Sequence, residues 1–345
     1  MFEHCEVTIG IPVYRSEDYI GKTMESVLCQ TFPDIEFLIV DDCGGDGSMQ
    51  VIRNLQQTHP RGDAIRILTN NRNQGVSYSR NRIISEAQGR FIYFLDSDDL
   101  IEPDTIQKLY DAAIIHQSQV ACAAYDIVNS NSSESPRIYR QASMVFEGAD
   151  ALASYAYKYN KVFQVSACNA LIDLSFLRQT GIRFINAAYW EDMAFTTELV
   201  TKVSRAVLIP DVTYHYVRRS GSLSNYQGRE DISKREVMAN VSVLDYLKTF
   251  CKTVSCNPYL PDLCFNLEMN SFYTACHILR KRHHIMPRFT TQEMRQILRH
   301  PFPLSSILRF PHKRTSNLVF WFLGIVPTFL FVPLLWILGK IKRAV

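Results

Sequence analysis

The first 125 residues alternate between short apolar runs and amphipathic segments, and this alternation limits the possible folds more than any other feature. Runs with strand character are followed by stretches in which apolar residues recur with helical spacing. The expected strands are 7–12, 35–41, 65–70, 90–95 and 120–125, and the expected helices are 19–29, 48–57, 76–87 and 103–116. Strands that alternate with helices predict an α/β domain built on a doubly wound, mostly parallel sheet.

The later part of the chain has a different character. A polar stretch after Tyr125 predicts an exposed hairpin or flap, residues 144–217 mix helix and strand, and the chain is mainly helical after Asp231. We therefore expect three regions. They are an α/β domain over residues 1–225, a helical basic region over 226–316 and a hydrophobic tail over 317–345.

The tail combines apolar length with positive charge. From Arg280 to Val345 the chain has twelve Lys or Arg residues and one acidic residue, and Leu318–Gly339 contains 22 residues without a charge. That length suits a bilayer-crossing helix, whereas Pro327 and Pro333 also permit a kinked or re-entrant segment. A buried hairpin of a helical domain is the alternative. We expect the tail to hold the protein at the cytoplasmic face of a membrane, either peripherally or as a single pass.

Acidic residues follow two of the expected strands. Asp96, Asp98 and Asp99 follow the strand over 90–95, and Asp41 and Asp42 close the strand over 35–41. Ligands of such sheets bind at the carboxyl ends of the strands. Neighbouring carboxylates raise one another's pKa unless a cation neutralises them, and Mg²⁺ or Mn²⁺ commonly shares such ligands with substrate phosphates. The pattern thus indicates a metal and a nucleotide diphosphate; an acidic turn before the next helix is the alternative.

Three stretches carry a resemblance to a known family. In order over residues 5–220 they are "VTIGIPVYRSEDYIGKTMESVLCQTFPDIEFLIVDDCGGDGS", "NRNQGVSYSRNRIISEAQGRFIYFLDSDDLIEPD" and "YWEDMAF". Together they resemble the non-processive, bacterial-type family 2 glycosyltransferases. The resemblance implies a GT-A fold, which is a doubly wound, Rossmann-like mixed sheet. It also implies inverting transfer of one sugar from a nucleotide sugar, most simply a UDP-sugar, in cell-surface polysaccharide synthesis.

The resemblance further implies a nucleotide-sugar site. Its members would be Pro12, Tyr14, Asp42, Asn73, Arg80, Asp96 and Ser97. Pro12 and Tyr14 would form a floor and a stacking surface for the base, and Asp42 would accept a hydrogen bond from its imide nitrogen. Asn73 would also meet the base, and Arg80 would meet the nucleotide or the acidic cluster.

Two further roles follow from the same resemblance. A Mn²⁺ or Mg²⁺ ion would be held by Asp98, with Asp96 and His215 as additional ligands, although a histidine in a strand is more commonly a packed residue. Asp192, with Glu191 as the fallback, would be the general base that takes a proton from the attacking sugar hydroxyl. Acids in the first turn of a helix are also common as capping residues, and this alternative stays open.

The expected partners are a nucleotide-sugar donor, a glycan or polyprenyl-linked acceptor and a membrane surface, with no nucleic acid. Two other functions compete with this one. A nucleotidyltransferase would need a glycine-rich loop after the first strand, but "PVYRSEDY" has no glycine before Gly21. A non-catalytic sugar-nucleotide-binding membrane protein would keep the pocket without a general base. The donor sugar, the linkage and the oligomeric state are not predicted.

Overall fold

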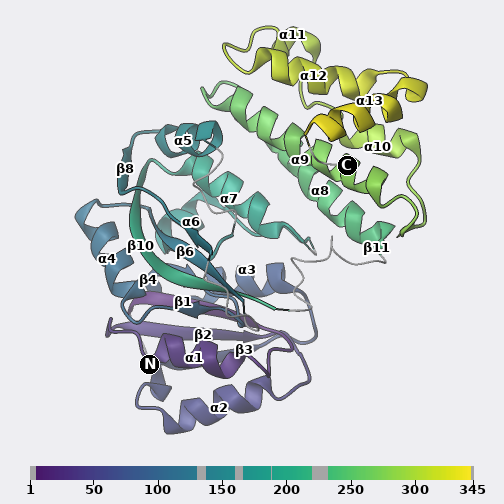
Figure 1. The fold of residues 1–345 in the computed structure, drawn as a ribbon. Helices are drawn as coiled ribbons and strands as arrows, with labels where there is room; N and C mark the ends of the chain where they lie inside the picture. Colours follow the sequence, from purple (N-terminus) through teal and green to yellow (C-terminus); the bar gives the residue numbers. More distant parts are fainter. Residues whose placement is uncertain (1–4, 130–136, 160–165, 188, 220–231, 343–345) are drawn as a thin grey trace. The chain divides into compact units, whose positions relative to one another are not determined.

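The computed structural model describes residues 5–129, 137–159, 166–187, 189–219 and 232–342 (Figure 1). The chain forms two compact units. The first comprises Met1–Leu152, Gln164–Asn186 and Phe195–Ser222, and the second comprises Ala153–Phe163, Ala187–Ala194 and Leu223–Val345. The boundaries cross two helices, so α5 (Ala151–Tyr159) and α7 (Glu191–Lys202) each contribute residues to both units.

A ten-stranded mixed sheet forms the first unit, as counted over the described residues. Its strands are β1 (Cys5–Val13), β2 (Ile35–Asp41), β3 (Ile65–Thr69), β4 (Gly89–Phe94), β5 (Leu100–Ile101), β6 (Val120–Asn129), β7 (Arg137–Tyr139), β8 (Met144–Glu147), β9 (Ala170–Asp173) and β10 (Arg205–Arg218). The order is β3-β2-β1-β4-β9-β6-β10-β5, with β7 beside β6 and β8 beside β10. β1 pairs in parallel with β2 and β4, whereas β9 runs antiparallel to β4 and β6. The predicted doubly wound, mixed sheet is confirmed.

The remaining elements of the first unit connect these strands. They are α1 (Ile20–Leu28), α2 (Ser48–Thr58), the 3-10 helix η1 (Gly62–Ala64), α3 (Val76–Glu86), α4 (Thr105–Ile115) and α6 (Leu174–Thr180), together with the parts of α5 and α7 that belong to this unit. The predicted hairpin is also present, because β7 pairs antiparallel with β6. Its connection, residues 130–136, lies outside the described residues.

Burial explains why the central strands were readable from the sequence. Six of the seven residues of β2 are buried, and Phe91–Phe94 of β4 are almost inaccessible. Strands covered on both faces read as continuous apolar runs. Glu36 interrupts the run in β2, but Thr8 Oγ1 and Arg66 Nε donate to its carboxylate at 2.6 and 2.7 Å. The buried charge is therefore compensated.

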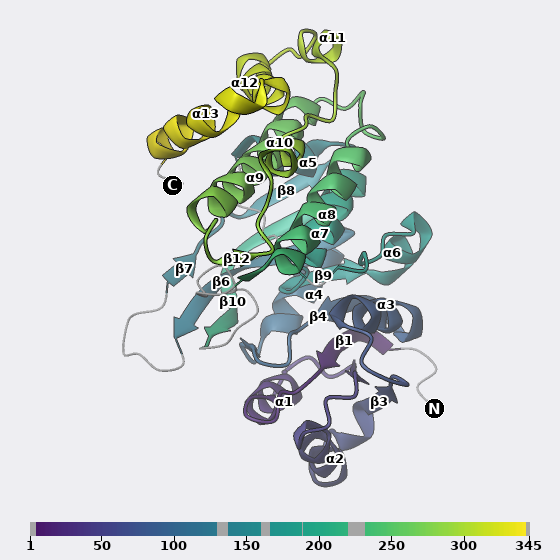
Figure 2. The ribbon, with the colours of Figure 1, turned by 90° about the vertical axis from the view of Figure 1, so that its right-hand side faces the viewer.

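The second unit is helical. Its elements are β11 (Ile232–Ser233), α8 (Lys234–Phe250), α9 (Leu260–Arg280), β12 (Ile285–Met286), α10 (Thr291–Ile297), α11 (Leu304–Ile307), α12 (Arg314–Ile325) and α13 (Thr328–Ile341). One apolar core joins α8, α9, α10, α12 and α13, and Figure 2 shows α12 and α13 beside α9 and α10. One buried ion pair joins α8 to α9, with Lys248 Nζ 2.9 Å from Glu268 Oε1. Burial raises the pKa of Glu268 to about 7, against the opposing effect of Lys248.

The tail does not form the uninterrupted apolar helix considered for Leu318–Gly339. α12 ends at Ile325 and α13 begins at Thr328, because Val326 and Pro327 adopt extended backbone and Pro327 has no amide hydrogen to continue the helix. Pro333 is accommodated inside α13. Within the described residues, none of the helices is both long enough and apolar enough to cross a membrane.

Gly89 offers a test of the sheet packing. A Cβ atom there would lie 2.5 Å from the backbone nitrogen of Thr8 and 2.8 Å from the carbonyl carbon of Val7. Because neither backbone atom can move without disturbing the pairing of β1 with β4, we expect Gly89→Ala to destabilise the fold by about 1–3 kcal/mol. The melting temperature, followed by circular dichroism, should fall accordingly.

Gly21 provides the matched control. It lies inside α1, and a Cβ there would meet only Val51 Cγ1, at 3.8 Å. Since alanine favours a helix over glycine by up to about 1 kcal/mol, Gly21→Ala should leave the melting temperature unchanged or raise it. Equal melting temperatures for the two variants would contradict the close approach of β4 to β1.

Candidate functional site

Parallel pairing brings the ends of three strands to one edge of the sheet. Val13 is paired with Asp41, and Asp41 is paired with Thr69, so β1, β2 and β3 end together. The pairing of Gly10 with Phe94 brings the end of β4 to the same edge. The residues that follow these strands therefore lie in adjacent loops, as predicted for the nucleotide-sugar site.

Asp42 lies buried at this edge and organises the loop before α3. Its Oδ1 accepts hydrogen bonds from Asn70 Nδ2 at 2.7 Å and from the Gln74 amide at 2.8 Å, and its Oδ2 accepts one from the Gly75 amide at 2.8 Å. A carboxylate has about four acceptor positions, so about one remains. Asn73 adds a contact, because its Oδ1 accepts from the Gly75 amide at 3.1 Å.

The end of β1 supplies the two residues predicted to support a base. Pro12 is buried within the strand, whereas the side chain of Tyr14 is 41% exposed. The Arg15 guanidinium lies 5.2 Å from the centroid of the Tyr14 ring. A hollow of about 290 Å³ lies beside these residues, and Val13, Arg15 and Asp41 contribute to its lining. Asp41 also fixes the next loop, because its Oδ1 accepts from the Cys43 amide at 2.9 Å.

Asp96 is paired with a buried arginine. Arg80 Nη2 of α3 lies 2.7 Å from Asp96 Oδ1, and the Arg80 guanidinium stacks over the Phe184 ring at 5.2 Å. The arginine therefore meets the acidic cluster, which was one of its two predicted roles. A guanidinium that is almost fully buried loses hydration, and its pairing with the Asp96 carboxylate offsets part of that cost. Asp96 keeps a third of its side chain exposed.

Ser97 connects the acidic turn to α1. Its hydroxyl lies 2.5 Å from the hydroxyl of Ser16, and its carbonyl accepts a hydrogen bond from Thr23 Oγ1 at 3.1 Å. These contacts hold the backbone between the two aspartates in place. They give Ser97 a structural role in addition to its predicted place in the nucleotide-sugar site.

Asp98 forms an ion pair with Arg219, at the end of β10. Burial and the charge of Asp96 raise the pKa of Asp98, while the Arg219 guanidinium opposes this rise. The guanidinium also lies 4.2 Å from the centroid of the Tyr19 ring, and the face of an aromatic ring attracts a cation. Arg219 was not among the site residues predicted from the sequence. A partner 121 positions away leaves no signal in sequence spacing.

Asp99 is an anchor for β10 and not a cap for the following helix. It is buried, its Oδ1 accepts a hydrogen bond from the Val217 amide at 2.8 Å, and its other oxygen bonds to the Tyr214 hydroxyl. Burial and the charges of Asp96 and Asp98 raise the pKa of Asp99 well above its usual range. The position before α4 is Asp104, whose side chain makes no capping hydrogen bond.

His215 is placed differently from the prediction. Its Nδ1 lies 2.8 Å from Asp126 Oδ1, and its Nε2 lies 3.0 Å from Glu102 Oε1. Both ring nitrogens are thus engaged by carboxylates outside the Asp96–Asp98 turn. Over the described residues there is no group of three or more His, Cys, Asp or Glu side chains arranged to hold a metal ion. The structure therefore does not gather His215 with Asp96 and Asp98 as a third ligand.

The acidic pair after Trp190 begins α7, as predicted. Glu191 and Asp192 occupy its first turn and belong to the second unit, whereas Phe195, one turn later, belongs to the first. Phe195 stacks on Phe184 with ring centroids 4.0 Å apart. Glu191 is buried and Asp192 is partly exposed, so Asp192 is the more accessible carboxylate.

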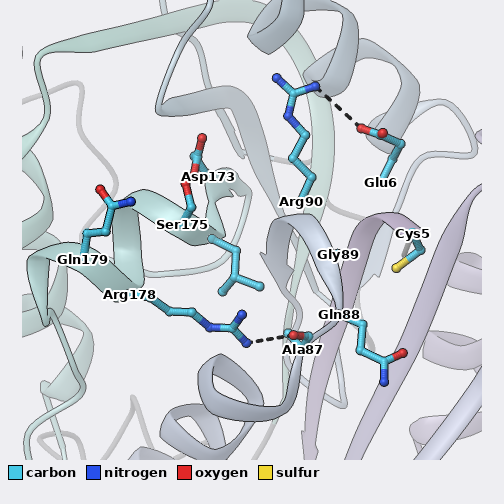
Figure 3. Close-up of a pocket in the computed structure, with 11 residues that line it drawn as sticks. Cys5, Glu6, Ala87, Gln88, Gly89, Arg90, Asp173, Ser175, Arg178 and Gln179 are labelled. Atoms are coloured by element: carbon cyan, nitrogen blue, oxygen red, sulfur yellow. Dashed lines mark hydrogen bonds and ion pairs between the residues drawn. The ribbon is translucent and has the colours of Figure 1, made fainter. Parts of the chain in front are cut away.

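A larger hollow, of about 780 Å³, lies at the other edge of the sheet, where β1 and β4 begin (Figure 3). Arg90 and Glu6 in its lining approach to 3.8 Å, and Arg178 Nη2 donates to the Ala87 carbonyl at 2.8 Å. The cationic groups are thus engaged within the protein. The hollow contains none of the predicted site residues.

Comparison with known proteins assigns the chain to a class of enzyme. The family model described as "Glycosyl transferase family 2" matches residues 8–181, and the chain therefore belongs to this family. The succinoglycan biosynthesis protein ExoO of Rhizobium meliloti (strain 1021) is 28% identical over 224 residues, which are 64% of this chain and 62% of ExoO.

Two further comparisons concern a biosynthetic relative and a solved structure. The UDP-Glc:alpha-D-GlcNAc-diphosphoundecaprenol beta-1,3-glucosyltransferase WfaP of Escherichia coli is 26% identical over 247 residues, covering 71% of this chain and 90% of WfaP. The crystal structure of S. aureus TarS 1–349 in complex with UDP-GlcNAc aligns with a TM-score of 0.63 at 17% identity. That alignment covers 92% of this chain and 90% of the TarS chain. This likeness confirms the predicted GT-A fold.

The hydrogen bonds between Asp42 and the loop before α3 give a prediction that distinguishes the structural role of Asp42 from that of its neighbour Asp41. Asp42→Asn would keep one acceptor oxygen and turn an NH₂ group toward one of the amides that Asp42 now accepts from. We expect the free energy of unfolding to fall by about 1–3 kcal/mol. The Gln74 or Gly75 amide should exchange its hydrogen faster, as measured by hydrogen–deuterium exchange.

Asp41→Asn is the control, because among the described residues the one hydrogen bond that the Asp41 side chain accepts comes from the exposed amide of Cys43. It should leave exchange at Gln74 and Gly75 unchanged. If Asp42→Asn also leaves both amides as protected as in the native protein, Asp42 does not hold the loop.

Proposed function

We propose that this protein transfers one sugar per encounter from a UDP-sugar to a hydroxyl group of a glycan or polyprenyl-linked acceptor, with inversion, during cell-surface polysaccharide synthesis at the cytoplasmic face of a membrane. The observation that carries the proposal is the alignment of Asp42, Asp96 and Asp98 at one edge of the sheet in a family 2 chain. The names of ExoO and WfaP, which concern polysaccharide synthesis and a lipid-linked acceptor, support the substrate class.

The nucleotide would bind over the ends of β1 and β2. Tyr14 offers an exposed ring for stacking, and the remaining acceptor position of Asp42 suits an imide N–H. Asn73 is exposed at the start of the next loop and can contact the same base. These residues would fix the base, while Asp96 and Ser97 would lie toward the ribose and phosphates.

The donor set at Asp96 and Asp98 fits a divalent cation. Burial and mutual repulsion make the ionised form of Asp98 costly, and a hard cation relieves this cost. Two carboxylates suffice where phosphate oxygens complete the coordination, as is usual for Mg²⁺. Asp98 and Asp96 would hold Mn²⁺ or Mg²⁺, and Arg219 would release Asp98 when they do. A bound ion of this kind stabilises the negative charge of a departing diphosphate.

Asp192 would act as the general base. A sugar hydroxyl is a poor nucleophile, so a carboxylate must take its proton as the oxygen attacks the anomeric carbon. Asp192 is partly exposed on the first turn of α7, whereas Glu191 is buried, which favours Asp192 for contact with an acceptor. A single displacement from the face opposite the diphosphate inverts the anomeric centre.

The metal assignment is tested by Asp98→Ala. Calorimetric titrations with UDP, in the presence and absence of Mn²⁺, measure the effect. The variant should lose the part of its affinity for UDP that depends on the metal, because the carboxylate that would face the cation is gone. Asp104→Ala is a suitable control, since Asp104 is a surface residue paired with Lys108 at 2.9 Å. Unchanged Mn²⁺-dependent binding of UDP to Asp98→Ala would defeat the assignment.

The catalytic assignment is tested by Asp192→Asn. We expect turnover with a UDP-sugar and acceptor panel to fall by roughly 10²–10⁴-fold while the affinity for UDP stays the same, because proton abstraction is lost and nucleotide binding is not. Asp211→Asn, at an exposed acid on β10, should leave both quantities unchanged. A sugar-nucleotide sensor would be indifferent to Asp192→Asn, and full turnover by this variant would reject the general-base role.

A further inference from the structure

The helical unit exposes large apolar side chains on α12 and α13. Six of them, which we call the tail face, are Phe322, Ile325, Phe329, Trp336, Ile337 and Ile341. Their exposure is high for apolar residues, at 76% for Phe329, 70% for Ile341 and 51% for Trp336. Scattered surface apolar residues need no explanation, but a contiguous set on two consecutive helices indicates an interaction surface.

The residues of the tail face are spaced so that they lie on one side of each helix. Phe322 and Ile325 lie one turn apart on α12, and Phe329, Trp336 and Ile337 recur at helical intervals on α13. The opposite sides are committed to the protein core, where Phe320, Leu323, Phe331 and Leu335 are buried. Both helices pack on α9, so their exposed sides face away from it (Figure 2).

The positive charges beside the tail face indicate what kind of surface can cover it. Lys313 and Arg314 begin α12, Lys340 and Lys342 end α13, and the sequence has no acidic residue after Glu293. The Lys340 ammonium lies 5.2 Å from the centroid of the Trp336 ring. A second copy of the chain would bring like charges together, whereas anionic lipid headgroups would neutralise them. Tryptophan beside lysine is also typical of a membrane–water boundary.

We propose that the tail face docks in the plane of an anionic lipid bilayer, with the apolar side chains inserted to the boundary between headgroups and acyl chains. α13 has 14 residues and is therefore about 21 Å long, shorter than the roughly 30 Å hydrocarbon core of a bilayer. Its buried side is held against α9 and α10. An amphipathic arrangement of this kind lies on a membrane surface. This proposal states how the protein would attach to the membrane named in the proposed function. It does not depend on the role of Asp192 as general base.

Vesicle co-sedimentation of the purified full chain, without nucleotide, tests the proposal. The native protein should sediment with vesicles of phosphatidylglycerol and phosphatidylethanolamine and only weakly with pure phosphatidylcholine. Phe329→Ser combined with Ile341→Ser should weaken partitioning at least about tenfold, because two highly exposed apolar side chains no longer insert. Lys340→Gln combined with Lys342→Gln should weaken binding to the anionic vesicles alone and reduce its salt dependence.

Ile115→Ser is the matched control, because Ile115 is 73% exposed but lies on α4 of the first unit. It should bind vesicles as the native protein does. Circular dichroism would verify that each variant is folded. Absence of binding by the folded native protein, or equal loss in the Ile115 variant, would overturn the proposal. Self-association without lipid that Phe329→Ser abolishes would instead identify a second copy as the occupant.

Depth can be measured with Trp336 as the only tryptophan, after Trp190→Phe and Trp321→Phe. Its fluorescence should shift to the blue on vesicle binding, and brominated lipids should quench it most when the bromines lie near the headgroups. Strongest quenching by bromines at the bilayer centre would contradict an in-plane orientation.

Discussion

The parallel pairing of β1 with β2 and β4 is the constraint on which the site depends. It ends these strands at one edge, where the loops carrying Asp42 and the Asp96–Asp98 turn must meet. The carboxyl groups that meet there, such as those of Asp96 and Asp98, would repel one another strongly without counter-charges. The protein supplies two counter-charges, Arg80 from α3 and Arg219 directly after β10, and the sheet topology delivers both to this edge.

The residues at this edge differ in their roles. Some hold the site in shape, and others remain available to a ligand. Arg80 and Asp99 direct their side chains to partners within the protein, and Asp42 does so with all but about one of its acceptor positions. Tyr14, Asn73 and Asp96 retain exposed groups. Binding residues held by such an inner layer keep their geometry before a ligand arrives, which lowers the cost of ordering them.

Much of the fold followed from the sequence because its strands are buried on both faces. The runs at 35–41 and 90–95 read as strands almost to the residue, and the acidic pair Glu191–Asp192 does stand in the first turn of a helix, α7. The insertion of β9 between β4 and β6 was not readable, since antiparallel pairing across 80 residues leaves no local pattern. For the same reason the engagement of His215 by Glu102 and Asp126, and of Asp98 by Arg219, was missed. The break in the tail at Pro327 was only one of several alternatives that the prolines allowed.

An arginine that neutralises Asp98 from within the chain has a practical consequence. Where carboxylates depend on a bound ion alone, chelators leave them mutually repelling and the surrounding loops loosen. Here Arg219, which also lies against the Tyr19 ring, supplies a positive charge to the acidic turn from within the chain. Storage in EDTA should therefore leave the nucleotide-free protein folded, so that crystals or spectra of it can be obtained before any donor or cation is chosen.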